Sequence, residues 1–213
     1  MTPGRKLANL LRRERELWDS GLTRIAGVDE AGVGPLAGPV VAAAVVFPPG
    51  VGIQGVNDSK QLTPIRRAEL AVEIRATAAA CCVVAVEPDE IDRINILRAS
   101  LEAMRRAVAG LGIEPEHVLV DARRIPGVTA PQEPIVKGDA KCHAIAAASI
   151  LAKTERDALM LRYDAEYPGY GFAEHKGYPT ESHRDAIRRL GPCRIHRMSF
   201  TLLPARALFD GPA

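Results

Sequence analysis

The chain has 213 residues, of which 47% are hydrophobic and 25% charged, a composition typical of a globular protein with one sizeable core. Its formal net charge of +2 is too small to indicate nucleic-acid binding by overall charge, so clusters of basic residues have to be considered locally. Residues 1–21 contain no long apolar stretch, which excludes a signal peptide or membrane span there and predicts a short basic amphipathic helix.

Apolar runs bounded by glycine, proline or polar turns predict five strands, over residues 25–29, 40–47, 81–88, 117–122 and 133–139. Helical patterns cover residues 65–78 (opened by Thr63–Pro64), 89–109, 140–167 and 181–191. The first three strands have short connections, whereas the later strands alternate with helices and should therefore be parallel. The sequence predicts an α/β fold with a five-stranded mixed sheet flanked by helices.

The four cysteines form no spaced framework. Cys81 and Cys82 are adjacent in a predicted strand and should point to opposite faces, while Cys142 and Cys193 have no second ligand at metal-site spacing. We therefore expect free thiols and a reducing, cytoplasmic location.

Four acidic residues follow or end predicted strands. Asp29 and Glu30 close the first strand, Asp121 closes the fourth, and Asp139 stands at the N-cap of the long helix that follows the fifth. Sites in open α/β sheets form beyond the carboxyl ends of the strands, so these side chains can meet at one edge. Because neighbouring residues in a strand face opposite ways, Asp29 and Glu30 should share a site only if the chain bends at 31–32.

Converging carboxylates repel one another unless a cation lies between them. Without cysteine or histidine at zinc spacing, Mg²⁺ or Mn²⁺ on oxygen ligands is the natural expectation, and two ions about 4 Å apart suit phosphodiester hydrolysis. The alternative is structural: Asp139 as a helix cap and the other acids as turn residues. By itself, this pattern predicts only metal-dependent phosphoryl chemistry.

The glycine-rich loop after the first acids has a rival interpretation as a dinucleotide fingerprint. Gly32, Gly34 and Gly38 read G-x-G-x-x-x-G, which is one residue too long. A β-branched strand also follows where the fingerprint requires a helix, so we reject this interpretation.

Long blocks of the sequence resemble the ribonuclease HII (type 2 ribonuclease H) family, in the family's order, over residues 22–200. They are "GVDEAGVGPLAGPVVAAAVV", "NDSKQLT", "LVDA", "IVKGDAKCHAIAAASILAKTERD", "YPGYGFAEHKGYPTESHRDAIRRLGPCRIHR" and "SF". The resemblance implies a ribonuclease H-like fold with a helical C-terminal extension. We expect an N-terminal helical segment (1–21), a catalytic domain (22–200) and a tail (201–213), without the extra N-terminal domain of the related type 3 enzymes.

The resemblance implies an endonuclease that cuts the RNA strand of RNA–DNA hybrids. It also implies cleavage 5′ to ribonucleotides embedded in duplex DNA, and hence a role in ribonucleotide removal. By matching position, the metal-binding catalytic carboxylates would be Asp29, Glu30, Asp121 and Asp139. Two Mg²⁺ or Mn²⁺ ions would give 3′-hydroxyl and 5′-phosphate products.

Further residues match substrate-binding positions of the family. The main chain of Gly32, Val33 and Gly34 would contact the 2′-hydroxyl, which distinguishes RNA from DNA. Tyr178 matches a tyrosine that stacks on the sugar at the RNA–DNA step, although by itself it suggests a loop tyrosine anchoring the last helix.

Ser59 and Lys60 match positions near the substrate backbone, although their composition alone favours an exposed turn. Val33 departs from the family, which usually has Arg or Lys there. The main-chain contact to the 2′-hydroxyl survives this change, but a charged contact to phosphate does not.

The remaining polar residues are less specific. Five arginines near the C-terminal end either contact phosphates or form a solvated helix face, and the sequence favours neither alternative. They are Arg184, Arg188, Arg189, Arg194 and Arg197. We expect Lys153 and Arg156 to form helix-surface pairs that support the site. Structural or substrate-adjacent roles, without metal ligation, are expected for His143, His175, His183 and His196.

Two other functions remain as alternatives: a DNA-directed nuclease of the same fold, and a non-catalytic hybrid-binding protein. The four acids argue against the second, because a protein that only binds has no use for mutually repelling carboxylates. The expected partners are hybrids and ribonucleotide-containing duplexes, with no membrane, and the expected state is a monomer. A sliding-clamp contact through "LLPARALFDGPA" has no support in the sequence.

Overall fold

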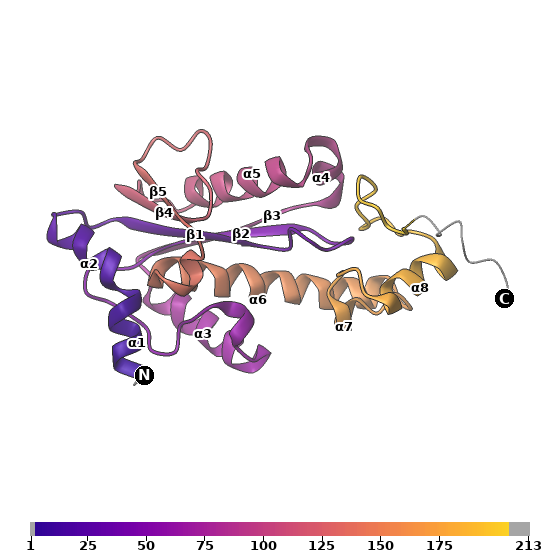
Figure 1. Cartoon of the computed structure of the whole chain (residues 1–213), viewed down its shortest axis with the longest axis horizontal. Helices are drawn as coiled ribbons and strands as arrows, with labels where there is room; N and C mark the ends of the chain where they lie inside the picture. Colours follow the sequence, from indigo (N-terminus) through magenta and orange to yellow (C-terminus); the bar gives the residue numbers. More distant parts are fainter. Residues whose placement is uncertain (1–2, 205–213) are drawn as a thin grey trace, which may run out of the picture.

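The computed structural model describes residues 3–204, and its centre is a five-stranded sheet of order β3-β2-β1-β4-β5 (Figure 1). The strands are β1 (Ile25–Ala31), β2 (Val40–Val46), β3 (Ala80–Val86), β4 (His117–Asp121) and β5 (Gln132–Ile135). The pairs β1–β2 and β2–β3 are antiparallel, whereas β1–β4 and β4–β5 are parallel. The predicted mixed sheet, with its later strands parallel, is confirmed.

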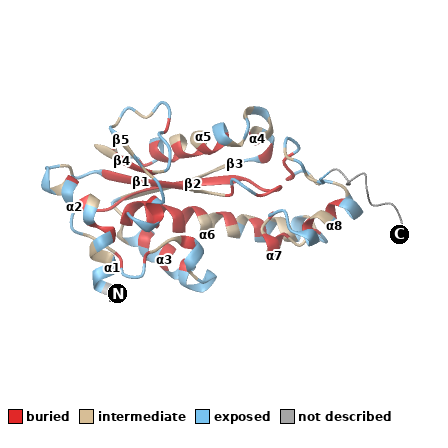
Figure 2. Cartoon of the chain, viewed as in Figure 1, coloured by how far each residue is buried: buried red, intermediate tan, exposed pale blue. Residues whose placement is uncertain are grey.

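Helices cover both faces of the sheet (Figure 1). One face carries α4 (Pro88–Ile94) and α5 (Ile96–Ala109), and the other carries α3 (Pro64–Thr77) and the long α6 (His143–Glu166). Strand β2 is buried along its whole length between these layers, as Figure 2 shows. The short α7 (Phe172–His175) and α8 (Glu181–Leu190) lie at the far end of α6 and form the expected C-terminal extension.

Helix α6 packs unusually close to the sheet. A Cβ atom added at Gly27 in β1 would lie 2.1 Å from the carbonyl carbon of Ala144 in α6, which no side chain tolerates. The alanines that crowd the first half of α6 are fully or almost fully buried. Small residues on both sides therefore fix the distance between α6 and the strand that carries two of the candidate acids.

Several predicted elements are interrupted. The N-terminal helix is divided into α1 (Pro3–Leu10) and α2 (Arg12–Asp19), and the pattern over 89–109 breaks at Asn95 into α4 and α5. Asn95 has a φ of 70°, and its side chain accepts a hydrogen bond from the amide of Arg98, so it starts a new helix as an N-cap. The third strand ends at Val86, because Pro88 already begins α4.

The segment before α6 also differs from the prediction. Strand β5 ends at Ile135, and a 3₁₀ turn, η2 (Gly138–Ala140), follows it. Cys142 is the N-cap of α6, so the assignment of Asp139 as that cap is wrong. The cause is tertiary: the amide of Gly138 donates to Oδ1 of Asp121 at 2.7 Å, which holds the turn against the end of β4.

The two N-terminal helices are packed onto the body of the protein. The buried carboxylate of Glu14 in α2 accepts a hydrogen bond from the amide of Ala144, in the first turn of α6, at 2.9 Å. Leu17 joins a buried cluster with Ile25 and Leu119. All four cysteines are free thiols, as expected. Within residues 3–204, no helix has the length and apolarity needed to cross a membrane.

Candidate active site

The carboxyl end of the central strand pair brings two acids together. Strands β1 and β4 are parallel, with Val28 opposite Val120, so the next residues in register are Asp29 and Asp121. Residues in register on neighbouring strands point to the same face, with the strands about 4.8 Å apart. This is the face of Gly27, which α6 covers.

Glu30 reaches the same edge from the other face. Strand β1 stays regular through Ala31, which pairs with Val41, so the bend predicted at 31–32 begins only at Gly32, with a φ of 94°. The bend expected at 31–32 is therefore present at Gly32, two residues after Glu30. Strand β4 stops at Asp121, and Glu30 and Asp121 together line a hollow of about 400 Å³ beyond its end.

Asp29, Glu30 and Asp139 have raised pKa values. Burial raises the pKa of Asp29 well above its ordinary value, and the charges of Glu30, Asp121 and Asp139 raise it further. Burial and then the charge of Asp121 raise the pKa of Glu30 to about 7. Burial also raises the pKa of Asp139. The acids thus form one cluster with excess negative charge at the end of the sheet.

Two cations lie near this cluster. Lys60 lowers the pKa of both Glu30 and Asp139 by its charge, and Arg123 lowers that of Glu30. These opposing effects are smaller than burial, so the pKa of each carboxyl remains raised. A site of this kind favours binding of further positive charge.

The donor set fits hard divalent cations, which prefer carboxylate oxygens. As the side chains stand, no three His, Cys, Asp or Glu residues in the described part of the chain are gathered around one point as metal ligands. Two oxygens instead accept backbone hydrogen bonds of 2.7 Å: Oδ1 of Asp29 from Glu30, and Oδ1 of Asp121 from Gly138. To hold a metal ion at this edge, these side chains would have to rotate.

Arg197 holds the glycine-rich loop from behind. Its guanidinium is fully buried and donates to four carbonyl oxygens, those of Gly32 at 2.6 Å, Val33 at 3.0 Å, Pro35 at 2.9 Å and Gly38 at 2.9 Å. In a trans peptide the C=O and N–H point in opposite directions. The amides that follow Gly32 and Val33 therefore point away from Arg197.

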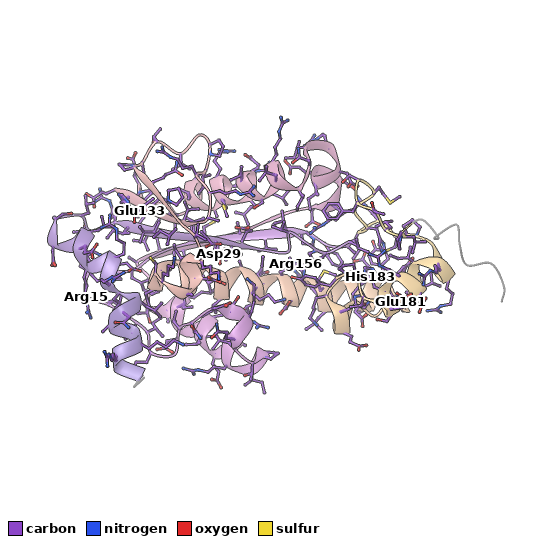
Figure 3. All side chains as sticks on the ribbon, in the orientation of Figure 1. Arg15, Asp29, Glu133, Arg156, Glu181 and His183 are labelled. Carbon is purple, nitrogen blue, oxygen red and sulfur yellow. The ribbon has the colours of Figure 1, made fainter. Side chains whose placement is uncertain are left out.

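Arg156, from α6, supports the same loop from a second side (Figure 3). It is also fully buried and donates to the carbonyl oxygens of Pro39 at 3.0 Å, Ala37 at 3.1 Å and Lys176 at 3.0 Å. Burial lowers the pKa of Arg156, and the charges of Tyr178 and Asp157 offset this only in part. The last of these bonds ties the glycine loop to the segment that carries Tyr178.

Both arginines contradict the sequence-based interpretation. Arg156 was expected on a helix surface, and Arg197 was expected on a phosphate or a solvated face. Their role was missed because nothing local distinguishes them from exposed arginines. The one signal was a loop rich in glycine and proline, whose carbonyl oxygens need donors from elsewhere.

Tyr178 lies beside the glycine loop with 42% of its surface exposed. Its Cε1 atom is 3.9 Å from where a Cβ at Gly34 would lie, and the guanidinium of Arg156 is 5.9 Å from its ring centroid. The backbone is fixed, because the carbonyl of Tyr178 accepts a hydrogen bond of 2.9 Å from Nδ1 of His183. The backbone of Tyr178 is thus tied to α8, as the structural alternative expects, while its ring is left partly exposed beside the glycine loop.

The Ser59–Lys60 turn is only partly exposed. Ser59 is buried, and its hydroxyl lies 2.8 Å from that of Ser149 in α6, so the exposed-turn alternative is wrong for this residue. Lys60 is exposed and lies near the acids. Its position fits a contact with a substrate phosphate, and Ser59 acts as the anchor of the turn.

Most of the other basic residues and the histidines make structural contacts, whereas Arg194 is exposed and has no hydrogen bond or ion pair within residues 3–204. Lys153 pairs with Asp157 at 2.6 Å, and Arg188 pairs with Glu181 and Asp185. Single backbone carbonyls accept hydrogen bonds from Arg184 and Arg189. The four histidines bond to backbone groups or to one another, and His196 also lies 3.2 Å from Sγ of Cys193; they are His143, His175, His183 and His196.

Comparison with known proteins shows the family of the chain. The family model described as Ribonuclease HII matches residues 26–203. The chain belongs to the ribonuclease HII family. The ribonuclease HII of Moorella thermoacetica is 58% identical over 187 residues, which are 88% of this chain and 91% of that protein. The ribonuclease HII of Anaeromyxobacter sp. is 57% identical over 92% of this chain and 62% of that longer protein.

Solved ribonucleases of this type share the fold. The ribonuclease H2 of Pyrococcus horikoshii OT3 superposes with a TM-score of 0.71 at 30% identity, covering 84% of this chain and 94% of that one. The RNase HII of Archaeoglobus fulgidus, solved as a complex with PCNA, gives 0.70 at 28% identity, covering 88% and 100%. The predicted ribonuclease H-like fold is confirmed, and family membership makes the chain an endoribonuclease, a hydrolase of phosphodiester bonds.

Proposed function

We propose that this ribonuclease HII family enzyme hydrolyses the RNA strand of RNA–DNA hybrids and also cuts 5′ to ribonucleotides embedded in duplex DNA, so that it serves their removal. One observation carries the proposal. The acid cluster of Asp29, Glu30, Asp121 and Asp139 lies directly before a loop whose outward amides adjoin an exposed tyrosine. Hydrolytic groups thus lie beside groups suited to recognising a ribose.

The carboxylates supply the hydrolytic part of the site. Asp29, Glu30, Asp121 and Asp139 would hold Mg²⁺ or Mn²⁺, which when bound would supply Lewis-acid activation of water and stabilisation of the leaving oxygen. In-line displacement at phosphorus then gives 3′-hydroxyl and 5′-phosphate ends. The protein's own contribution is to fix the acids: β1 and β4 set the first three, and the η2 turn, tied to Asp121, sets Asp139.

The glycine loop and Tyr178 supply selectivity for RNA. The amides that follow Gly32 and Val33 can donate to a 2′-hydroxyl, a group that DNA lacks. The ring of Tyr178, beside Gly34, can lie against the neighbouring sugar. Lys60 offsets negative charge where the phosphate approaches Glu30 and Asp139.

The cellular setting is part of the same proposal. We place the reaction in the cytoplasm, since four free cysteines suit a reducing compartment, and we propose a monomer, which light scattering can test. The Archaeoglobus fulgidus protein was solved with PCNA. In this chain most of the segment considered for a clamp contact, residues 205–213, lies outside the described residues, and no clamp is proposed.

Cleavage of defined duplexes tests the function. The substrates are an RNA–DNA hybrid, a DNA duplex with one ribonucleotide, and the same duplex in DNA only, each with Mg²⁺, with Mn²⁺ and with EDTA. We expect the first two to be cut only with metal, with cleavage on the 5′ side of the ribonucleotide. Cleavage of the all-DNA duplex would favour the DNA-directed nuclease, and metal-independent binding without cleavage would favour the hybrid-binding protein.

A further inference from the structure

A basic hollow adjoins the end of the η2 turn, directly after Asp139 in the chain. Its volume is about 650 Å³, and it is lined by Lys6, Asn9, Leu10, Arg12, Ala140 and Lys141. The lining contains three cationic side chains and no acidic one. Because the net charge of the whole chain is only +2, this is a local concentration of positive charge and does not reflect a generally basic surface.

The three cations are exposed and unneutralised. Within residues 3–204, neither Lys6, Arg12 nor Lys141 makes an ion pair or a side-chain hydrogen bond. The acids nearby in the sequence are engaged elsewhere: Glu16 pairs with Arg13 at 2.8 Å, and Glu14 is buried against α6. An anion entering the hollow would therefore meet three free positive charges.

The hollow is rigidly placed relative to the acid cluster. Lys141 is two residues after Asp139, and its amide donates to the carbonyl of Gly138 within the same turn at 2.9 Å. On the other wall, α1 and α2 are fixed to the body by the hydrogen bond from Ala144 to Glu14, at the end of the sheet where α6 begins (Figure 1). Leu11 supports this docking, because its side chain fills the space beside Gly52.

We propose that this hollow, with Lys6, Arg12 and Lys141, binds the sugar–phosphate backbone of the substrate duplex where it leaves the active site. The inference rests on the proposed function, which puts a scissile phosphate at Asp139. Phosphates recur about every 3.4 Å of helix axis along each strand, so a duplex held at that acid presents further phosphates to the neighbouring hollow. Such contacts position the duplex without reporting its sequence or its sugar.

The triple variant Lys6→Gln/Arg12→Gln/Lys141→Gln tests the site, because it removes charge from exposed side chains without touching the acids. The matched control is Arg75→Gln/Arg93→Gln/Arg162→Gln, which removes the same charge from exposed positions far from the hollow. Binding is measured by fluorescence anisotropy, in an Asp121→Asn background that blocks cleavage. The probe is a long duplex with one central ribonucleotide, titrated with salt.

Each lost phosphate contact makes the slope of log affinity against log salt shallower by about 0.9. For three contacts, wild-type affinity should fall roughly 40-fold more than that of the hollow variant between 50 and 200 mM salt. The control should keep the wild-type slope. Selectivity for the ribonucleotide duplex over all-DNA duplex should be unchanged in the hollow variant.

Duplex length gives an independent measurement. Shortening the duplex from one end only should weaken wild-type binding to the level of the hollow variant, and the variant should lose nothing further on that side. Equal salt slopes for wild type and hollow variant, or equal losses in the variant and the control, would overturn the proposal. Failure of wild-type protein to cleave either ribose-containing substrate would instead overturn the proposed function.

Discussion

Replacing Arg197 by lysine should loosen the glycine loop while leaving the acid cluster intact. Arginine reaches four carbonyl oxygens of this loop because its planar fork directs donors in several fixed directions. The lysine ammonium is a single point on a flexible stem, and we expect it to keep no more than two of these hydrogen bonds. The substitution keeps the positive charge in the sequence and removes the geometry.

The expected cost follows from the contacts. A hydrogen bond with a charged partner contributes about 1.5–3 kcal/mol, so losing two costs about 3–6 kcal/mol. Burial and the charge of Arg156 already lower the pKa of Arg197 to about 9. The same burial would also lower the pKa of a lysine at this position, which weakens its remaining bonds. For a chain of this size, about 4 kcal/mol corresponds to a fall in Tm of roughly 8–16 °C.

The functional effect should appear in recognition of the ribose. Displacement of reacting groups by about 1 Å costs on the order of 100-fold, and we expect a loss of that size in kcat/KM for the single-ribonucleotide duplex. The assay combines urea unfolding with steady-state cleavage of the ribonucleotide duplex below the unfolding transition. The matched control is Arg189→Lys, because Arg189 is exposed and donates to a single carbonyl, that of Gly169.

The control should change stability by no more than about 0.5 kcal/mol. Wild-type stability together with wild-type kcat/KM in the Arg197→Lys protein would refute the role assigned to the arginine. Loss of stability with unchanged kcat/KM in the folded fraction would reduce Arg197 to a purely structural residue.

Four further predictions follow from the site and the core. Asp121→Asn should abolish cleavage while hybrid binding stays equal or tightens, because a negative ligand near a polyanion is lost; wild-type turnover at saturating Mg²⁺ would contradict this. For the single-ribonucleotide substrate, Tyr178→Phe should be mild and Tyr178→Ala should cost about 1–3 kcal/mol in binding; equal damage would implicate the hydroxyl, and none would exclude a substrate contact. Val33→Arg should tighten binding at moderate salt and steepen the salt slope by about 0.9, with unchanged selectivity against all-DNA duplex; parallel slopes would mean that residue 33 points away from the phosphates. Burial lowers the pKa of His143 from 6.5 to about 4. As the pH falls, the unfolded chain therefore binds a proton at this residue before the folded chain does, and the contribution of His143 to the free energy of unfolding is lost between pH 6.5 and 4. Urea unfolding at several pH values should therefore show a shallower acid loss in His143→Gln, and an unchanged profile would disprove the assignment.

The strands, their pairing and the positions of the acids could be predicted from the sequence because they depend on short-range signals. Periodicity and bounding turns predicted β2 within one residue, and Thr63 caps α3 as its hydroxyl predicts. A strand's direction fixes which end carries its last residues, so Asp29 and Asp121 had to lie at a carboxyl edge once the strands were parallel. The sequence by itself thus determined the sheet and the location of the acid cluster.

The setting of the recognition loop was decided only by the tertiary structure. From the sequence around them, Arg156 and Arg197 were predicted to be surface residues. A buried guanidinium is stable only where enough hydrogen-bond acceptors surround it, and the local sequence does not supply them. All but one of those acceptors are carbonyl oxygens of the loop over 32–39, at sequence separations of 117 to 165; the exception is the carbonyl of Lys176, 20 residues after Arg156. The position of Asp139 also depends on a tertiary contact, over a shorter sequence separation. The amide of Gly138 donates a hydrogen bond to Asp121, which holds Asp139 in a 3₁₀ turn outside the helix. No local pattern encodes a contact whose partner is supplied by the fold.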